Sequence, residues 1–365
     1  MKTLSVIVLV LARQLALAQD SLVATTTISG FVDFYYSKNV AKPSTRVNKL
    51  RNFDIPENQF TLSLAEIVFQ KRAEPVGFRV DLDFGTTNDI VQGIAPYGTT
   101  PYNTLTNFQQ AYLTAVIPIG DGLTLDAGKF VTHMGYEVIE SKDNWNYSRS
   151  LLFSWAVPYY HTGVRLMYPL GNNLTVGVHV VNGWNSVADN NDQKSLGFTL
   201  NYAPRTCTSI IVNVMDGFEQ PTGSDIGKKK VFDFIVTHQL SDAFTLALNL
   251  DYGDERLAGA GTSPTVLPTW KGLALYGRYA IGSKSAVALR GEIFDDPIGY
   301  ATGLGVPGLD VKEVTGTYEY RFTDALIVRG EARYDFSNAT VFDEKSRGNT
   351  QSNQLTFLVG LVAVF

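Results

Sequence analysis

Short segments in which apolar and polar residues alternate recur along the chain from about residue 28 to its end. Alternation with a period of two residues is typical of a β-strand whose two faces meet different surroundings. Each segment is about ten residues long, the length that a tilted strand needs to cross a bilayer. The pattern predicts strands at roughly 28–36, 59–70, 76–85, 107–117, 122–131, 161–169, 174–182, 195–203, 207–215, 230–240, 243–253, 270–280, 285–294, 312–321, 325–335 and 353–365.

The connections between these segments alternate between short and long. Gly120-Asp121 and Gly171-Asn172 are tight turns of residues that favour turns, whereas residues 38–58, 132–160 and 295–311 are long connections. Short turns at one end and long loops at the other are typical of outer-membrane barrels, which usually have an even number of strands. We therefore predict an all-β fold: a transmembrane up-and-down antiparallel β-barrel of about 16 strands.

The two faces of the predicted strands differ sharply in charge. In residues 326–335 every second residue from Arg329 onward is charged, and the residues between them are Gly330, Ala332 and Tyr334. A charged row of this kind cannot face lipid, where a midplane Arg or Lys costs roughly 2–4 kcal/mol. About sixteen strands enclose an aqueous channel that accepts such a row. The residues predicted to face this lumen are Asp81, Asp83, Arg165, Arg290, Glu292, Arg329, Glu331 and Arg333.

Two charged residues break the alternation. Glu66 has the same parity as Leu64, and Lys129 has the same parity as Leu125. A β-bulge adds one residue to a strand and exchanges its two faces beyond that point. We therefore expect a bulge near each of these two charges.

The connection over residues 132–160 is the longest mixed one in the chain, with Trp145, Trp155 and a cluster of tyrosines. A long loop in a compact domain is usually either functional or disordered, and this one is too aromatic for disorder. If its flanking strands are neighbours in a barrel, the loop lies at the mouth and can fold inward. Tyr159 and Tyr160, beside a strand start, are expected in the aromatic girdle at the membrane interface.

The N-terminus has the pattern of a secretory signal peptide: Lys2, an apolar run over residues 4–12, and the small-x-small site Ala16-Leu17-Ala18. We predict a signal peptide at 1–18 and a single barrel domain at 19–365. The chain would then be exported to the outer membrane of a Gram-negative bacterium. At the other end, the alternating last strand closes on Phe365, and a terminal aromatic residue resembles the signal that the barrel-assembly machinery recognises.

Composition narrows the chemistry. Cys207 is the single cysteine, so no disulfide framework or cysteine-based metal site is predicted. The net charge is −5, or −7 after removal of Lys2 and Arg13, which argues against nucleic acid as a partner. The four histidines lack close metal-ligand spacing, although His133 and His161 could approach each other at the two stems of the long loop. No Gly-x-Ser-x-Gly elbow occurs. We expect no cofactor and no enzymatic activity.

The runs GFVDFYY at 30–36, PVGFRVDLDFG at 75–85, LDAGKFVTHMGYEVIESKDNWNYSRSLLFSWAVPYYHTGVR at 125–165 and VVNGWN at 180–185 resemble the OmpL-like family of β-barrel porins. The resemblance implies an outer-membrane channel for passive diffusion of small polar solutes and ions. The expected partners are outer-membrane lipid, these solutes and the assembly machinery, and the expected assembly is a homotrimer.

In general porins the third outer loop folds into the lumen and narrows it, and residues 132–160 are the third long connection here. The resemblance thus implies that this loop constricts the channel. Its acidic residues could then face basic residues of the wall and set the ion preference. Alternatively, these charges are solvated and have no selective role. The constriction residues expected on the loop are Glu137, Glu140, Asp143 and Arg149.

Two other functions fit a barrel of this kind. One is an outer-membrane barrel enzyme of the lipase or protease type, and the other is an adhesin or receptor that acts through its loops. Barrel enzymes generally have fewer strands, so a count of twelve or fewer would favour an enzyme.

Overall fold

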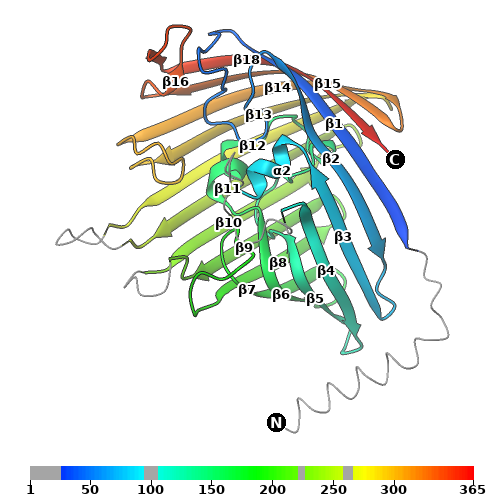
Figure 1. Cartoon of the computed structure of the whole chain (residues 1–365). Coiled ribbons are helices and arrows are strands. Elements are labelled where there is room, and N and C mark those ends of the chain that lie inside the picture. Colours follow the sequence, from blue (N-terminus) through cyan, green and yellow to red (C-terminus); the bar gives the residue numbers. More distant parts are fainter. Residues whose placement is uncertain (1–25, 94–105, 221–226, 258–265) are drawn as a thin grey trace.

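The computed structural model describes residues 26–93, 106–220, 227–257 and 266–365. Within these residues, sixteen strands close into one antiparallel barrel (Figure 1). The predicted signal peptide at 1–18 lies outside the described residues. The barrel strands are β1 (Thr27–Asn39), β2 (Gln59–Lys71), β3 (Val76–Phe84), β4 (Phe108–Ile117), β5 (Leu123–Val131), β6 (Tyr160–Pro169), β7 (Leu174–Val181), β8 (Ser195–Arg205), β9 (Thr208–Gly217), β10 (Lys229–Gln239), β11 (Phe244–Glu255), β12 (Thr269–Ile281), β13 (Ser285–Asp296), β14 (Leu309–Thr323), β15 (Leu326–Ser337) and β18 (Asn353–Val364).

Each strand pairs with its neighbours in the chain, and the first and last strands close the barrel. β1 pairs with β18 from Phe31 opposite Val364 to Asn39 opposite Thr356 (Figure 1). The predicted strands are confirmed, with ends that differ by a few residues. Closure leaves no free strand edge in the barrel, which is what a bilayer requires of a β-structure.

The alternation in sequence becomes an inner and an outer face. On β15, Arg329, Glu331 and Arg333 point into the barrel and are buried, whereas Leu326 and Tyr334 are exposed on the outside. The same division holds on the other strands that carry predicted lumen residues. An apolar exterior beside a charged interior is the arrangement of a barrel in lipid.

One of the two predicted bulges is present. The pairing of β1 with β2 shifts by one residue at Ser63, so that Leu64 and Glu66 turn to the inside. The prediction of a bulge near Lys129 is wrong, because β5 pairs with both neighbouring strands without a shift of register there. The Lys129 ammonium is satisfied locally instead, by Gln92 Oε1 at 2.6 Å and the carbonyl oxygen of Phe108 at 2.7 Å.

The remaining elements lie in the long connections. The helix α2 (Thr86–Val91) follows β3, and Thr87 lies 3.0 Å from the Ser63 hydroxyl of β2. The strands β16 (Phe342–Asp343) and β17 (Thr350–Gln351) form a small hairpin before β18. The connection between β5 and β6 contains the short turns η3 (Ser141–Asp143) and η4 (Leu152–Ala156). No helix in the described part of the chain is long and apolar enough to span a membrane.

Candidate functional site

The connection between β5 and β6, residues 132–159, is called the excursion below. It contacts the inner face of the barrel at widely separated strands. The amide of Gly135 donates to Asp233 Oδ2 of β10 at 3.0 Å, and the Ser141 hydroxyl donates to Asp33 Oδ2 of β1 at 2.6 Å. Between these points Tyr136 N donates to Asn249 Oδ1 of β11 at 3.1 Å. Inward-facing side chains thus replace water as partners for the polar groups of the excursion, which buried backbone requires.

Two wall carboxylates each hold a pair of consecutive amides. The Glu331 carboxylate of β15 accepts from the amides of residues 147–148 at 2.6 and 3.0 Å. The Glu292 carboxylate of β13 accepts from the amides of residues 151–152, both at 2.6 Å. Successive amides that converge on one anion form a compact anion-binding nest. These acidic residues therefore fix the excursion to the wall instead of contacting water.

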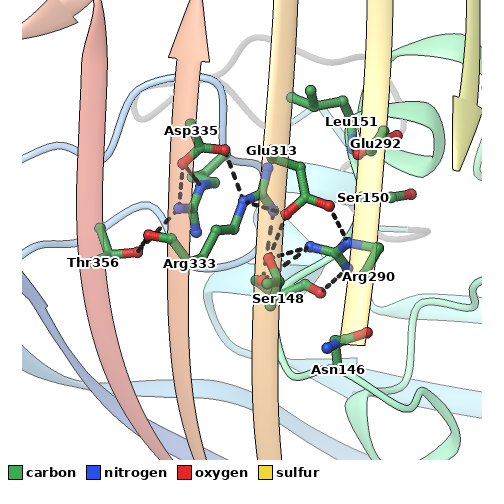
Figure 2. Close-up of polar contacts among 12 residues, drawn as sticks. Asn146, Ser148, Ser150, Leu151, Arg290, Glu292, Glu313, Arg333, Asp335 and Thr356 are labelled. Carbon is green, nitrogen blue, oxygen red and sulfur yellow. Dashed lines mark hydrogen bonds and ion pairs between the residues drawn. The ribbon is translucent and has the colours of Figure 1, made fainter. Parts of the chain in front are cut away.

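Arg290 of β13 is the centre of the same interface (Figure 2). Its guanidinium bonds Glu313 of β14 at 2.7 Å, Glu137 of the excursion at 2.7 Å and the Ser148 carbonyl oxygen at 2.7 Å. Arg290 is fully buried. The expected encounter between an acidic residue of the loop and a basic residue of the wall is present here as a direct ion pair.

Two further arginines of the wall also bind both an acidic side chain of the wall and a carbonyl oxygen of the excursion. Arg333 donates to Asp335 at 2.8 Å and to the Arg149 carbonyl oxygen at 2.6 Å, and Figure 2 shows it beside Arg290. Arg329 pairs with Glu319 at 2.7 Å and donates to the Ser141 carbonyl oxygen. Both guanidinium groups are therefore paired within the interface between the wall and the excursion.

Arg149 has a role within the excursion that the sequence did not indicate. Its guanidinium donates to the carbonyl oxygens of Val138, Ile139 and Tyr147, the last at 2.6 Å. It also lies 4.7 Å from the centre of the Phe53 ring. Arg149 therefore closes the excursion on itself and is buried, whereas a role at the constriction surface was expected.

The first long loop also folds inward, which sequence reasoning missed. Arg51 donates to Asp335 Oδ2 of β15 at 2.5 Å and to Asp54 at 2.5 Å. Asn52 donates to the Ser154 carbonyl oxygen at 2.8 Å and to the Tyr159 hydroxyl at 2.7 Å. A buried arginine with two acidic partners has no period or spacing that marks it in sequence.

The aromatic residues of the excursion pack it down. Tyr159 is buried against Phe53 and Phe153, with ring centres 5.6 Å from each, and Tyr160 donates to the Asn185 carbonyl oxygen at 2.6 Å. The expectation that Tyr159 and Tyr160 belong to an interfacial girdle is wrong. Both rings are buried, Tyr159 beside Asn52 and Tyr160 beside Asn185, so neither is exposed to lipid.

The predicted site residues thus fall into two groups by exposure. Asp143 and Arg165 retain exposed side chains, at 55% and 20%, and Glu140 is partly exposed. Asp143 pairs with Lys142, so the tip of the excursion presents both signs of charge. The other predicted site residues are buried, both on the strands and on the excursion: Asp81, Asp83, Glu137, Arg149, Arg290, Glu292, Arg329, Glu331 and Arg333.

Burial alters two titrating groups of the excursion. It raises the pKa of the Tyr147 phenol well above its usual range, and the neutral hydroxyl donates to Asp33 Oδ1 at 2.6 Å. Burial also raises the pKa of Glu140, against the opposing effects of a backbone hydrogen bond and of Lys142. Glu140 therefore loses its charge at a higher pH than an ordinary glutamate.

The histidines at the stems of the excursion meet as expected. The rings of His133 and His161 lie 5.6 Å apart, and His179 stacks on His133 at 4.0 Å. His161 is hydrogen-bonded at both nitrogens, to Gly183 and Thr132. In the described ranges, no group of three or more His, Cys, Asp or Glu side chains is arranged to hold a metal ion.

Comparison with known proteins agrees with this architecture. A family model described as "Putative beta-barrel porin-2, OmpL-like" matches residues 25–365. No significant match was found among curated proteins.

Solved structures of outer-membrane proteins, among them a porin, have the same fold. An anion-selective porin from Comamonas acidovorans is 11% identical with a TM-score of 0.62, over 93% of this chain and 99% of that one. The outer membrane channel DcaP of Acinetobacter baumannii is 13% identical with a TM-score of 0.61, over 93% and 97%. OmpT, an outer membrane protein of Vibrio cholerae solved in a trimer form, is 12% identical with a TM-score of 0.58, over 93% and 99%.

The family match covers almost the whole chain, and the structural matches share its fold. An apolar exterior and a charged interior are what such a channel requires. This chain belongs to the OmpL-like family of β-barrel porins, and it is an outer-membrane channel protein.

Proposed function

We propose that this protein is a passive, non-enzymatic channel for small polar solutes and ions, and that the excursion forms its narrowest zone. The observation that carries the proposal is the attachment of the excursion to inward-facing residues of β1, β10, β11, β13 and β15. A loop held at so many points of the interior reduces the open cross-section of the barrel. Solutes would pass between the excursion and the wall that it leaves uncovered.

The strand count supports a channel over a barrel enzyme. Sixteen strands exceed the twelve or fewer expected of an outer-membrane lipase or protease, and they leave room for water. The inward folding of residues 40–58 and 132–159 also supports a channel over an adhesin, because both loops are committed to contacts inside the barrel.

A planar bilayer experiment tests the proposed function. Purified protein should insert with stepwise increases in current and should conduct continuously in potassium chloride at low voltage, because a passive pore needs no energy source. Protein denatured before addition is the control. The folded state of the protein can be checked by comparing its gel mobility before and after heating. If folded protein produces no current steps, the proposal is contradicted.

We also infer export through a signal peptide at 1–18 and assembly through Phe365. The latter is supported by the position of Phe365 in barrel closure, where its amide donates to the Gly30 carbonyl oxygen at 3.0 Å and its own carbonyl accepts from Gly30 N at 3.2 Å. Outer-membrane lipid would surround the apolar exterior.

A homotrimer is the assembly we propose, and the trimer form of the Vibrio cholerae protein supports it. The protein component of the detergent-solubilised complex, measured by light scattering, should have three times the mass of one mature chain. A mass equal to one chain in several mild detergents would contradict this assembly.

A further inference from the structure

We propose that Arg79 of β3 and Arg165 of β6 form a binding site for oxyanions, the carboxylate or phosphate groups of solutes that pass through the channel. The inference rests on the proposed channel function and specifies a class of solute. Both arginines face the lumen, and their side chains are 29% and 20% exposed.

The two arginines are held in the same way. Arg79 donates through Nε to both oxygens of Asp81, at 2.9 and 3.0 Å. Arg165 donates through Nε to Asp126 Oδ2 at 2.7 Å. Both carboxylates are buried, so each lies behind its arginine. An ion pair through Nε fixes the plane of the guanidinium, and the carboxylate makes no hydrogen bond to the two terminal nitrogens.

A second donor on β4 orients each carboxylate. Gln110 donates to Asp81 Oδ2 at 2.6 Å, and Thr114 donates to Asp126 Oδ1 at 2.5 Å. Within the described residues, the terminal nitrogens of Arg79 and Arg165 have no hydrogen bond to the protein. Two guanidiniums that are oriented from behind and unbound in front match the two-point geometry by which arginine recognises carboxylate and phosphate.

The surface between the arginines is formed by one tyrosine and two glycines. Tyr112 of β4 lies opposite Arg79 in the sheet, and the next two positions along that row are Gly128 and Gly163. Arg165 stacks over the rings of Tyr112 and Phe130, at 5.3 and 4.7 Å from their centres. The two glycines have no side chains, so Tyr112 is the one ring along this row between the two guanidiniums, and both arginines flank it.

Space for a solute exists beside Arg79. A hollow of about 290 Å³ is lined by Arg79, by Gln70 and Glu66 of β2 and by Lys142 of the excursion, among others. Glu66 is the opposing charge in this hollow, but it is buried, whereas Arg79 and Lys142 retain exposed side chains. The exposed charges of the hollow are therefore those of the two cations.

Current recordings with inorganic phosphate as the probe test the site. In potassium chloride, addition of phosphate should reduce the single-channel chloride current of the wild-type protein, because bound phosphate occupies the passage. The reduction should be lost in Arg79→Gln/Arg165→Gln. It should also be lost in Arg165→Lys, which keeps the charge but not the guanidinium fork.

Arg321→Gln is the matched control. Arg321 also faces the lumen, is 42% exposed and pairs with Glu319 at 3.3 Å, so its replacement removes an equal charge elsewhere in the wall. This variant should keep the phosphate effect. An equal phosphate effect in the wild-type protein and the double variant, or an equal loss in Arg321→Gln, would overturn the site. Wild-type protein that conducts but is insensitive to phosphate would overturn the site alone, whereas protein that forms no channel would overturn the proposed function.

Discussion

Shortening the excursion between Glu137 and Leu152 should raise the single-channel conductance roughly two-fold or more, because the narrowest zone limits the current through a water-filled pore. The segment contains the amides held by Glu292 and Glu331 and the carbonyl oxygens held by Arg290 and Arg333. Its removal exposes these wall charges to water, which can hydrate them, so the barrel should still close through its strand pairs. Conductance in planar bilayers measures the effect.

The control for this deletion is a second deletion, in a loop that does not contact the excursion. Residues 344–349 connect β16 and β17, and most of them are exposed. Trimming them should leave the conductance near that of the wild-type protein. If the shortened excursion and the trimmed hairpin have the same conductance, the excursion does not form the constriction, and the narrowest zone lies elsewhere in the barrel.

Replacing Arg290 with methionine should release the excursion from the wall while the barrel remains folded. Arg290 is fully buried between Glu137 and Glu313, and its loss leaves Glu137 without the cation that it contacts. Removal of one partner from a buried ion pair costs about 3–5 kcal/mol. The excursion can avoid this cost by moving into the lumen, where water hydrates the carboxylate. Trypsin should then cleave after Arg149, which is buried in the wild-type protein.

A companion variant separates the release of the excursion from general damage. Glu137→Gln keeps Arg290 paired with Glu313, so its protease resistance should fall less than that of Arg290→Met. Adding Glu137→Gln to Arg290→Met should restore part of the resistance, because no buried charge is then left at residue 137. Equal resistance of Arg290→Met and wild-type protein would show that the interface is held mainly by the aromatic packing around Tyr159.

The acidic residues of the excursion should contribute unequally to the ion preference of the channel. Rings of exposed carboxylates favour cations. Glu137 is buried in its pair with Arg290, so it adds little to such a ring, whereas Glu140 and Asp143 retain exposed surface. The expectation that all three acidic residues act together therefore applies best to Glu140 and Asp143.

The sequence by itself determined the barrel, its strands and the direction of its charged rows. This was possible because a strand in lipid must alternate apolar and polar residues every second position, and because a slip of one residue would place Arg329 or Arg333 in hydrocarbon. The alternation of short turns and long loops likewise predicted the up-and-down order of the strands. The bulge at Ser63 could be predicted from the change of parity at Glu66. The same argument failed at Lys129, because a nearby backbone carbonyl oxygen and a side-chain amide oxygen bind its ammonium without a bulge.

Only the tertiary structure decided which charges contact water. Glu292 and Asp143 look alike in sequence, but Glu292 binds two amides of the excursion and Asp143 remains exposed. That difference depends on where a loop of irregular backbone lies against strands more than a hundred residues away. No period in the sequence encodes such contacts, because they follow from the shape of the closed barrel and from the need to satisfy each buried polar group.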